Sequence, residues 1–305
     1  MGKIAFVFPG QGAQYPGMGK ELAEVSPAAA GVFRLVDAVR PGISEQCFCG
    51  SEELLRQTRV TQPCMFAVEQ AAAAALAEAG IHGDFAAGFS LGELSALTYA
   101  KLVDLSTSFA LVCRRGELME EAARKVPTAM AAVVRLENEK VEELCGRFEG
   151  VYPVNYNCPG QVSVAGRREA MAEFSAAVKA AGGRAIPLKV SGGFHSPFMA
   201  EAAKEFGKLL GDIAFAQPVI PLYSNCTGLP YGENVKELLA KQICSPVRWE
   251  AIIRHMIANG ADTFIEVGPG NTLCGLISKI DQNVRTFGVS DGESLEKCVA
   301  EVKVC

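Results

Sequence analysis

The chain has 305 residues, of which 49% are hydrophobic, and a net charge of −5 from 29 basic and 34 acidic residues. This length and composition predict a globular protein with a large buried core. Charges of both signs are interspersed, which excludes a basic stripe for nucleic acid and a polybasic patch for a membrane surface. The sequence also has no run of 18 apolar residues that could span a bilayer.

The cysteines and the first residues predict a reducing location. Eleven cysteines are scattered from Cys47 to Cys305, without the spacing of a disulfide framework or of a zinc finger. The apolar run after Met1 is too short for a signal peptide. We therefore expect a cytoplasmic protein with free thiols and no bound metal.

Strand and helix patterns alternate over the first part of the chain. The predicted elements are, in order, a strand at 4–8, helices at 21–39 and 63–79, a strand at 84–88, and helices at 91–101 and 106–123. Alternation of this kind predicts an α/β domain with a mostly parallel sheet.

The pattern changes between residues 127 and 190, where the predicted order is strand, helix, strand, strand, helix, strand. The strands are predicted at 129–136, 151–157, 161–165 and 185–190, and the helices at 139–145 and 168–181. Strands at 220–224 and 263–267 and helices near 233–243, 249–259 and 293–303 follow. We predict a large α/β-hydrolase-like domain, formed by 1–126 and 191–305, and an inserted small ferredoxin-like domain at 127–190.

Residues 88–92 read Gly-Phe-Ser-Leu-Gly and fit the G-x-S-x-G pattern of a nucleophile elbow. A short apolar strand precedes them and a helical pattern follows, which is the context that an elbow requires. The pattern therefore predicts Ser90 at the exposed tip of a sharp turn. The alternative is an ordinary serine that caps a helix.

A serine hydroxyl needs a base to become a nucleophile, and the chain has only three histidines. His82 lies in a turn and His255 in a helical pattern, so we expect neither to act. His195 lies in a glycine-rich loop where the chain leaves the predicted small domain, and ligands favour such places. Its ring could be oriented by an acid such as Asp104 or by a backbone carbonyl, and the sequence favours the carbonyl.

Eight motifs occur in order over nearly the whole chain. They are Phe8-Pro-Gly-Gln-Gly12, Thr61-Gln-Pro63, Gly88-Phe-Ser-Leu-Gly-Glu93, Arg115-Gly116, Asn155-Tyr-Asn-Cys-Pro-Gly-Gln161, Gly193-Phe-His195, Ser245-Pro-Val-Arg-Trp249 and Glu266-Val-Gly-Pro-Gly270. With these motifs the chain resembles the malonyl-CoA:acyl carrier protein transacylase family. That family loads malonyl units for fatty-acid synthesis and has close relatives in polyketide synthases.

The resemblance implies roles for the residues of the elbow and of the loop at 10–12. It makes Ser90 the nucleophile and His195 its base. It also makes the backbone amides of Gln11 and Leu91 the oxyanion hole, because fixed N–H groups stabilise the charge that develops on the reacting carbonyl.

The resemblance also implies an acyl pocket. Arg115 matches the malonate-binding arginine of the family, and a guanidinium can grip a carboxylate with two parallel hydrogen bonds. Gln62 and Met119 match positions that line the same pocket. Phe194 matches a position that crowds an α-substituent and so favours malonyl over methylmalonyl.

Two positions raise questions within this pattern. Phe89 stands where most relatives have His beside the nucleophile, which changes the polarity of the pocket but leaves the predicted dyad intact. The backbone carbonyl that orients the base in the family falls near Arg248, and a carbonyl is present whatever side chain stands there.

The implied reaction is a ping-pong transfer of malonyl from malonyl-CoA to the phosphopantetheine thiol of an acyl carrier protein, through a malonyl-serine ester. We expect no cofactor and no metal, an acyl carrier protein docked on a local basic patch, no nucleic acid or membrane partner, and a monomer. The alternatives are a free-standing acyltransferase for a polyketide synthase, a serine esterase or thioesterase that uses water, and a catalytically silent scaffold.

Overall fold

The structure is a computed structural model, and it describes residues 2–303. Contacts between residues divide the chain into two compact units. The first unit comprises Met1–Gly116, Ala214–Tyr223 and Arg254–Cys305, and the second comprises Glu117–Ile213 and Ser224–Ile253.

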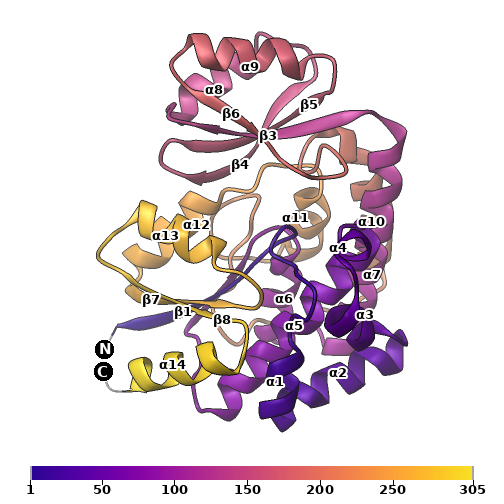
Figure 1. Cartoon of the computed structure of the whole chain (residues 1–305), viewed down its shortest axis with the longest axis vertical. Helices are drawn as coiled ribbons and strands as arrows, with labels where there is room; N and C mark the ends of the chain where they lie inside the picture. The colour runs from indigo at the N-terminus through magenta and orange to yellow at the C-terminus, as the bar shows by residue number, and fades with distance from the viewer. Residues whose placement is uncertain (1, 304–305) are drawn as a thin grey trace. The chain divides into compact units, whose positions relative to one another are not determined.

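The first unit contains a four-stranded parallel sheet in the order β2-β1-β7-β8 (Figure 1). Its strands are β1 (Lys3–Phe8), β2 (Phe85–Gly88), β7 (Ala261–Val267) and β8 (Arg285–Val289). In register, Phe8 pairs with Gly88, Val7 with Glu266, and Val267 with Val289. All four strands therefore end at the same edge of the sheet.

Helices pack around this sheet. They are α1 (Lys20–Val25), α2 (Pro27–Val39), α3 (Ile43–Cys49), α4 (Glu52–Leu55), α5 (Thr58–Glu78), α6 (Gly92–Tyr99), α13 (Thr272–Ile280) and α14 (Gly292–Lys303), while α7 (Leu105–Lys125) and α12 (Trp249–Ala258) have residues in both units. The central helix α5 is buried on almost all sides and packs against α2 and α6. Its alanines at 71–73 allow this close packing.

The helix predicted at 21–39 is two helices. Ser26 ends α1 and caps α2, because its Oγ accepts the Ala29 N–H at 3.1 Å and Pro27 follows at the first helical position. The helix predicted to start at Pro63 starts earlier, at Thr58. Pro63 has no N–H to donate back to Arg59, and the Arg59 carbonyl instead accepts Arg40 Nη1 at 3.4 Å.

The strand predicted at 220–224 is wrong. Strand β8, helices α3, α4 and α13, and a helix at 200–211 lie where no element was predicted. The segment at 220–224 forms only an isolated bridge, in which Leu222 pairs with Ala86. Strand β8 was missed because four of its five residues are half-buried and give no alternation.

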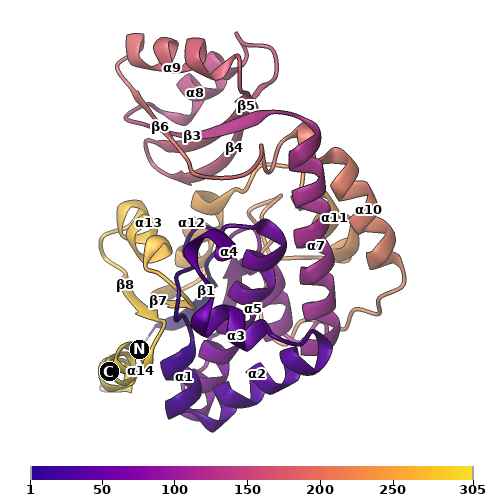
Figure 2. The ribbon, with the colours of Figure 1, turned by 45° about the vertical axis from the view of Figure 1, so that its right-hand side comes forward.

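The second unit contains a four-stranded antiparallel sheet in the order β4-β5-β3-β6. Its strands are β3 (Thr128–Val134), β4 (Val151–Cys158), β5 (Gln161–Arg167) and β6 (Arg184–Pro187), and helices α8 (Asn138–Cys145) and α9 (Met171–Ala180) interrupt them. Both views place α8 and α9 together on one face of the sheet (Figures 1 and 2). The chain order β3-α8-β4-β5-α9-β6 is the predicted one.

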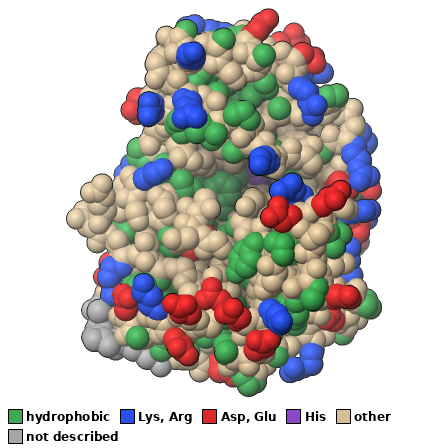
Figure 3. Space-filling view, viewed as in Figure 1, with side chains coloured by type: hydrophobic (Ala, Val, Ile, Leu, Met, Phe, Trp, Pro, Cys, Tyr) green, Lys and Arg blue, Asp and Glu red, His purple; other side chains and the backbone are tan. Residues whose placement is uncertain are grey.

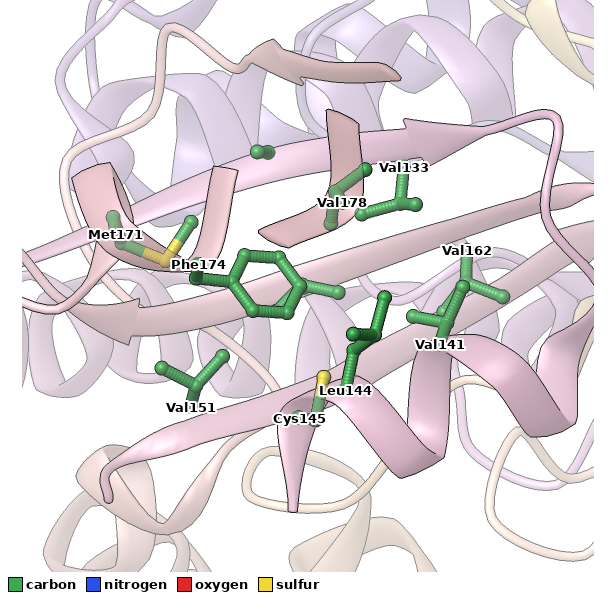
Figure 4. Packing of buried hydrophobic residues seen from close by; sticks show 11 residues of the cluster. Val133, Val141, Leu144, Cys145, Val151, Val162, Met171, Phe174 and Val178 are labelled. Atoms are coloured by element: carbon green, nitrogen blue, oxygen red, sulfur yellow. The ribbon is translucent and has the colours of Figure 1, made fainter. Parts of the chain in front are cut away.

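A compact apolar core holds α8 and α9 against this sheet (Figure 4). Phe174 of α9 is fully buried, and its ring meets that of Phe148 edge to face at 5.9 Å. Val141 and Leu144 of α8 and Val162 of β5 fill the same layer. The rest of the unit includes η1 (Pro197–Met199), α10 (Ala200–Gly211) and α11 (Val235–Gln242), with α10 packed on α11.

Three glutamates are buried in the first unit: Glu69 on α5, Glu93 on α6 and Glu266 at the end of β7. Burial raises the pKa of Glu69 well above its usual range, and the charge of Glu266 adds to the effect. Burial also raises the pKa of Glu266. The Cys274 N–H donates to Glu266 Oε2 at 2.8 Å and opposes this rise. A Cβ at Gly268 would lie 2.6 Å from Glu69 Cγ, so the turn after β7 packs directly against Glu69.

We predict that Glu69→Gln stabilises the protein at neutral pH. A carboxyl group whose pKa is raised in the folded state loses stability as pH rises from its unfolded value of about 4.3 toward the folded value. The amide has the same shape and no proton to lose, so the gain in free energy of unfolding should reach about 1 kcal/mol or more at pH 8 and be smaller at pH 5. Thermal unfolding at both pH values measures it.

The matched control for this prediction is Glu53→Gln, an exposed glutamate on α4. It should change the unfolding temperature little at either pH. A Glu69→Gln protein that is less stable than the native protein, or that shows the same difference at pH 5 and pH 8, would contradict the prediction.

Candidate active site

Ser90 lies in a sharp turn between β2 and α6, as the elbow pattern predicts. Its φ of 56° is in the left-handed region, where a residue with a side chain is strained by roughly 1 kcal/mol or more. Two backbone hydrogen bonds hold the turn: Phe89 N–H donates to Phe8 O at 2.9 Å, and Gly92 N–H donates to Phe89 O at 3.0 Å. The neighbouring strand β1 and the start of α6 thus fix the serine from both sides.

The two glycines of the elbow have no room for a side chain. A Cβ on Gly88 would lie 1.8 Å from the carbonyl carbon of Gly92, and a Cβ on Gly92 would lie 2.1 Å from Phe8 O. The loop after β1 is as close, because a Cβ on Gly10 would lie 2.7 Å from Phe89 O. The glycines therefore allow β1, β2 and α6 to converge on Ser90.

Gln11 and Leu91, the predicted oxyanion residues, both lie in this converging region. Leu91 is buried and directly precedes α6, whose N-terminal end carries the positive pole of the helix. Gln11 belongs to the loop that packs on Phe89, and its Nε2 donates to Thr58 Oγ1 at 3.3 Å. Both residues belong to the same unit as Ser90.

Arg115 of α7 reaches the nucleophile. Its side chain is fully buried, Nη2 donates to Ser90 Oγ at 3.2 Å, and Nη1 donates to Gln62 Oε1 at 2.9 Å. Burial lowers the pKa of Arg115 to about 10, and the charge of the buried Glu93 opposes this. The guanidinium thus remains charged at neutral pH beside the serine, a position that favours an anionic group.

His195 lies in the second unit and is nearly fully buried. Its backbone also has a left-handed φ, of 59°, and its N–H donates to Ile243 O at 3.2 Å. Its Nδ1 lies 2.9 Å from the backbone oxygen of Gln242, and because a carbonyl only accepts, Nδ1 carries the proton. This tautomer leaves Nε2 unprotonated and able to take a proton.

The structure places a different carbonyl at His195 from the one expected. The expected position was Arg248, whose backbone carbonyl accepts the Ile252 N–H of α12 at 3.1 Å. Gln242, at the end of α11, supplies the carbonyl at Nδ1 instead. The partner of Nδ1 is thus a backbone carbonyl and not a carboxylate.

The loop that carries His195 is tied down by short contacts. Gly193 N–H donates to Thr128 Oγ1 at 2.7 Å, and Ser196 Oγ donates to Gly193 O at 2.5 Å. Phe194 is buried beside the histidine. Met119, also buried, lies one helical turn after Arg115 on α7.

The other two histidines have no visible role in this chemistry. His82 is exposed. His255 lies on α12, where Nδ1 is 3.0 Å from the Tyr223 hydroxyl and 3.1 Å from Asn259 Nδ2. These contacts tie α12 to the segment at 214–223.

Among residues 2–303, no group of three or more His, Cys, Asp or Glu side chains could hold a metal ion. Within the same residues, no helix is both long enough and apolar enough to cross a membrane.

Comparison with known proteins points to one family. The family model "Acyl transferase domain" matches residues 5–295. The malonyl CoA-acyl carrier protein transacylase of Bacillus subtilis (strain 168) is 39% identical to this chain over 99% of the chain and 98% of its own length.

Solved structures agree with this result. The malonyl CoA-acyl carrier protein transacylase from Clostridium perfringens matches with a TM-score of 0.96 at 37% identity, covering 99% of this chain and 98% of that one. A malonyl-transacylase solved in complex with its type II PKS acyl-carrier protein matches with a TM-score of 0.94 at 34% identity, covering 98% of this chain and 99% of that one.

We predict that Gly88→Ala disrupts the elbow. The added methyl group would overlap the backbone of Gly92 and Glu93, which no rotamer change can relieve, so the loss in free energy of unfolding should exceed about 3 kcal/mol. Urea unfolding measures this loss. The matched control is Gly275→Ala on α13, where a Cβ has nothing within 4 Å.

The control should be as stable as the native protein or gain about 0.5 kcal/mol, because Ala favours a helix over Gly. Equal unfolding midpoints for the two variants would show that β2 and α6 do not approach as closely as described.

Proposed function

The chain belongs to the acyl transferase domain family, and we propose that it transfers the malonyl group from malonyl-CoA to the phosphopantetheine thiol of an acyl carrier protein. The observation that carries this proposal is the buried guanidinium of Arg115, whose Nη2 lies 3.2 Å from Ser90 Oγ. A fixed cation at the nucleophile suits an acyl group that ends in a carboxylate. The relatives named malonyl CoA-acyl carrier protein transacylase support the same activity.

Arg115 selects the acyl group through geometry and charge. A planar guanidinium can donate two parallel hydrogen bonds to a carboxylate, and burial strengthens that pair because water is excluded. Gln62 Oε1 holds Nη1 at 2.9 Å and so fixes the plane of the group. An acetyl group has no charge for this site to bind, so the pocket favours malonyl.

In the first half-reaction His195 removes the proton of Ser90, and Ser90 Oγ attacks the thioester carbonyl of malonyl-CoA. The oxyanion accepts hydrogen bonds from the backbone N–H groups of Gln11 and Leu91. When the carbon–sulfur bond breaks, protonated His195 gives its proton to the departing CoA thiolate. A malonyl ester remains on Ser90.

In the second half-reaction the carrier's phosphopantetheine thiol takes the place of CoA. His195 removes the thiol proton, the sulfur attacks the ester carbonyl, and the same two amides stabilise the oxyanion. The ester bond breaks, Ser90 takes the proton back from His195, and malonyl leaves on the carrier. Arg115 holds the malonyl carboxylate throughout.

The remaining site residues position these groups. We assign the orientation of the His195 ring to the backbone carbonyl of Gln242 in place of Arg248, on the strength of the 2.9 Å contact. Phe194 and Met119 are buried and apolar, and they complete the acyl pocket by shape.

The partner is an acyl carrier protein, and the named complex of a relative with its carrier supports this assignment. Acidic and basic side chains are interspersed on the face drawn in Figure 3, so we propose docking on a local cluster of cations. We also propose a cytoplasmic monomer that uses substrates only, without cofactor or metal. Fatty-acid and polyketide synthesis would both use this transfer.

We propose that residues 127–190 form a ferredoxin-like insert, which the element order and the sheet order β4-β5-β3-β6 support. We propose an α/β-hydrolase-like description for 1–126 and 191–305, which the parallel sheet and the elbow support. The compact units divide the chain differently, because residues 117–126, 191–213 and 224–253 belong to the second unit.

We predict that Arg115→Met lowers kcat/KM for malonyl transfer to the carrier by about 100-fold or more, because a buried carboxylate loses its partner. The rate with acetyl-CoA should stay the same or rise. The kcat/KM of Arg115→Lys should lie between those of the native protein and Arg115→Met, because lysine keeps the charge and loses the two parallel hydrogen bonds. Steady-state transfer with both donors measures the ratio.

The matched control is Arg114→Met, because Arg114 is the exposed neighbour on the same helix. It should leave both rates within about twofold of native, a change of less than about 0.5 kcal/mol. An unchanged malonyl-to-acetyl ratio in a folded Arg115→Met protein would contradict the assignment. Release of CoA by the native protein without loading of the carrier would favour a hydrolase.

A further inference from the structure

The turn at 268–270, part of the motif Glu266-Val-Gly-Pro-Gly270, has no role in the proposed mechanism, yet it lies at the same edge of the sheet as the loop that carries Gln11. That loop follows β1 and the turn follows β7, and the two strands are parallel neighbours in which Val7 pairs with Glu266. Both segments belong to the first unit. The loop and the turn therefore leave the sheet as neighbours.

Neighbouring elements hold the turn itself in place. Gly268 N–H donates to Val289 O, the last residue of β8, at 2.9 Å. The Glu266 side chain reaches past the turn, and its Oε2 accepts the Cys274 N–H in the first turn of α13 at 2.8 Å. On α5, Glu69 packs directly against the turn, because a Cβ at Gly268 would lie 2.6 Å from Glu69 Cγ. The turn is thus anchored to β8, α13 and α5.

This anchored turn approaches the loop on both sides of Gln11. A Cβ at Gly268 would lie 3.3 Å from Pro9 Cγ, and a Cβ at Gly270 would lie 3.0 Å from Ala13 Cβ. Pro9 and Ala13 stand two residues before and two residues after Gln11. The turn therefore restrains the loop at two points, with Gln11 between them.

The loop is also restrained from the side of the elbow. A Cβ at Gly10 would lie 2.7 Å from Phe89 O, and Gln11 Nε2 donates to Thr58 Oγ1 at 3.3 Å. A backbone N–H group stabilises an oxyanion only when it is held at hydrogen-bonding distance from the place where that charge develops. The elbow and the turn together fix the backbone on which this distance depends.

We propose that the turn at 268–270 positions the backbone amide of Gln11 for the oxyanion by holding Pro9 and Ala13 in place. The proposal rests on the proposed function, because it takes the Gln11 amide as an oxyanion donor. The hydrogen bond from this amide strengthens when the thioester carbonyl becomes an oxyanion. A displaced amide therefore lowers the rate of acylation and leaves the binding of malonyl-CoA unchanged.

The test is single-turnover acylation by malonyl-CoA without carrier, measured as release of CoA. Gly270→Ala should lower the limiting rate constant about tenfold, because the added methyl group meets Ala13 Cβ and displaces the loop by a fraction of an ångström. The malonyl-CoA concentration that gives half of the limiting rate should change by less than about twofold.

The matched control is Gly42→Ala. Gly42 has the same φ of 90° as Gly270, so alanine is equally strained there, but a Cβ at Gly42 has nothing within 4 Å among the described residues. The control should leave the limiting rate constant and the half-saturating concentration within about twofold of native.

A rescue separates positioning from general loss of stability. Ala13→Gly removes the Cβ that the new methyl group meets, and the next atoms, Ala13 Cα and O, lie at 3.7 and 3.9 Å, which is ordinary contact. Gly270→Ala combined with Ala13→Gly should therefore recover the limiting rate constant to within about threefold of native. Because the backbone strain at residue 270 persists, the double variant should still unfold at a lower temperature than native protein.

A second variant tests the other side of Gln11 without adding a group. Pro9→Ala removes the ring that faces Gly268, and it should lower the limiting rate constant about fivefold at an unchanged half-saturating concentration. The matched control is Pro41→Ala, an exposed proline that follows α2. This variant decides the question if circular dichroism shows that Gly270→Ala does not fold.

Three results would overturn the proposal. They are a folded Gly270→Ala protein that is acylated as fast as Gly42→Ala, a double variant no faster than Gly270→Ala, and a native rate in Pro9→Ala. A rise in the half-saturating concentration in place of a slower limiting rate would assign the turn to substrate binding and also overturn it. If native protein releases no CoA from malonyl-CoA, the proposed function is wrong as well.

Discussion

The close approach of three backbone segments at Ser90 is the constraint on which the nucleophile side of the site depends. Strand β2 must turn into α6 within a few residues while the loop after β1 crosses the turn, and a Cβ at Gly88, Gly92 or Gly10 would lie within 2.7 Å of a backbone atom. This convergence holds Ser90 at a positive φ and brings the loop after β1 against Phe89. The glycines thus allow the close packing that holds Ser90 in a strained and fixed backbone conformation.

The residues of the proposed reaction form two sets, one in each unit. Within each set, neighbouring groups hold the side chains in a fixed orientation. In the first unit, a buried charged arginine is held by Gln62 and donates to Ser90, so the cation that we propose as the partner of the acyl carboxylate is in place before the substrate arrives. In the second unit, a backbone carbonyl sets the tautomer of His195 and leaves Nε2 unprotonated, as the proposed base requires. Groups that are already oriented in this way need little rearrangement during the reaction. This small cost of reorganisation is why fixed dipoles are effective in catalysis.

Sequence reasoning reached the elbow, the arginine and the β-α-β-β-α-β order, because glycine spacing, motif residues and alternation leave clear patterns. It assigned the base-orienting carbonyl to Arg248 when Gln242 supplies it, since a backbone group has no side-chain signature. It missed β8, whose half-buried residues do not alternate. It could not find Glu69 either, because nothing local indicates that a glutamate on a helix is buried.

The central claim is that malonyl passes through an ester on Ser90, and the intact mass of the protein after brief exposure to malonyl-CoA without carrier tests it most directly. The account predicts one malonyl group on the native chain, located by peptide mapping at Ser90, absent from Ser90→Ala, and discharged when a carrier bearing phosphopantetheine is added. Release of CoA without any adduct, or an adduct that persists in Ser90→Ala, would contradict it.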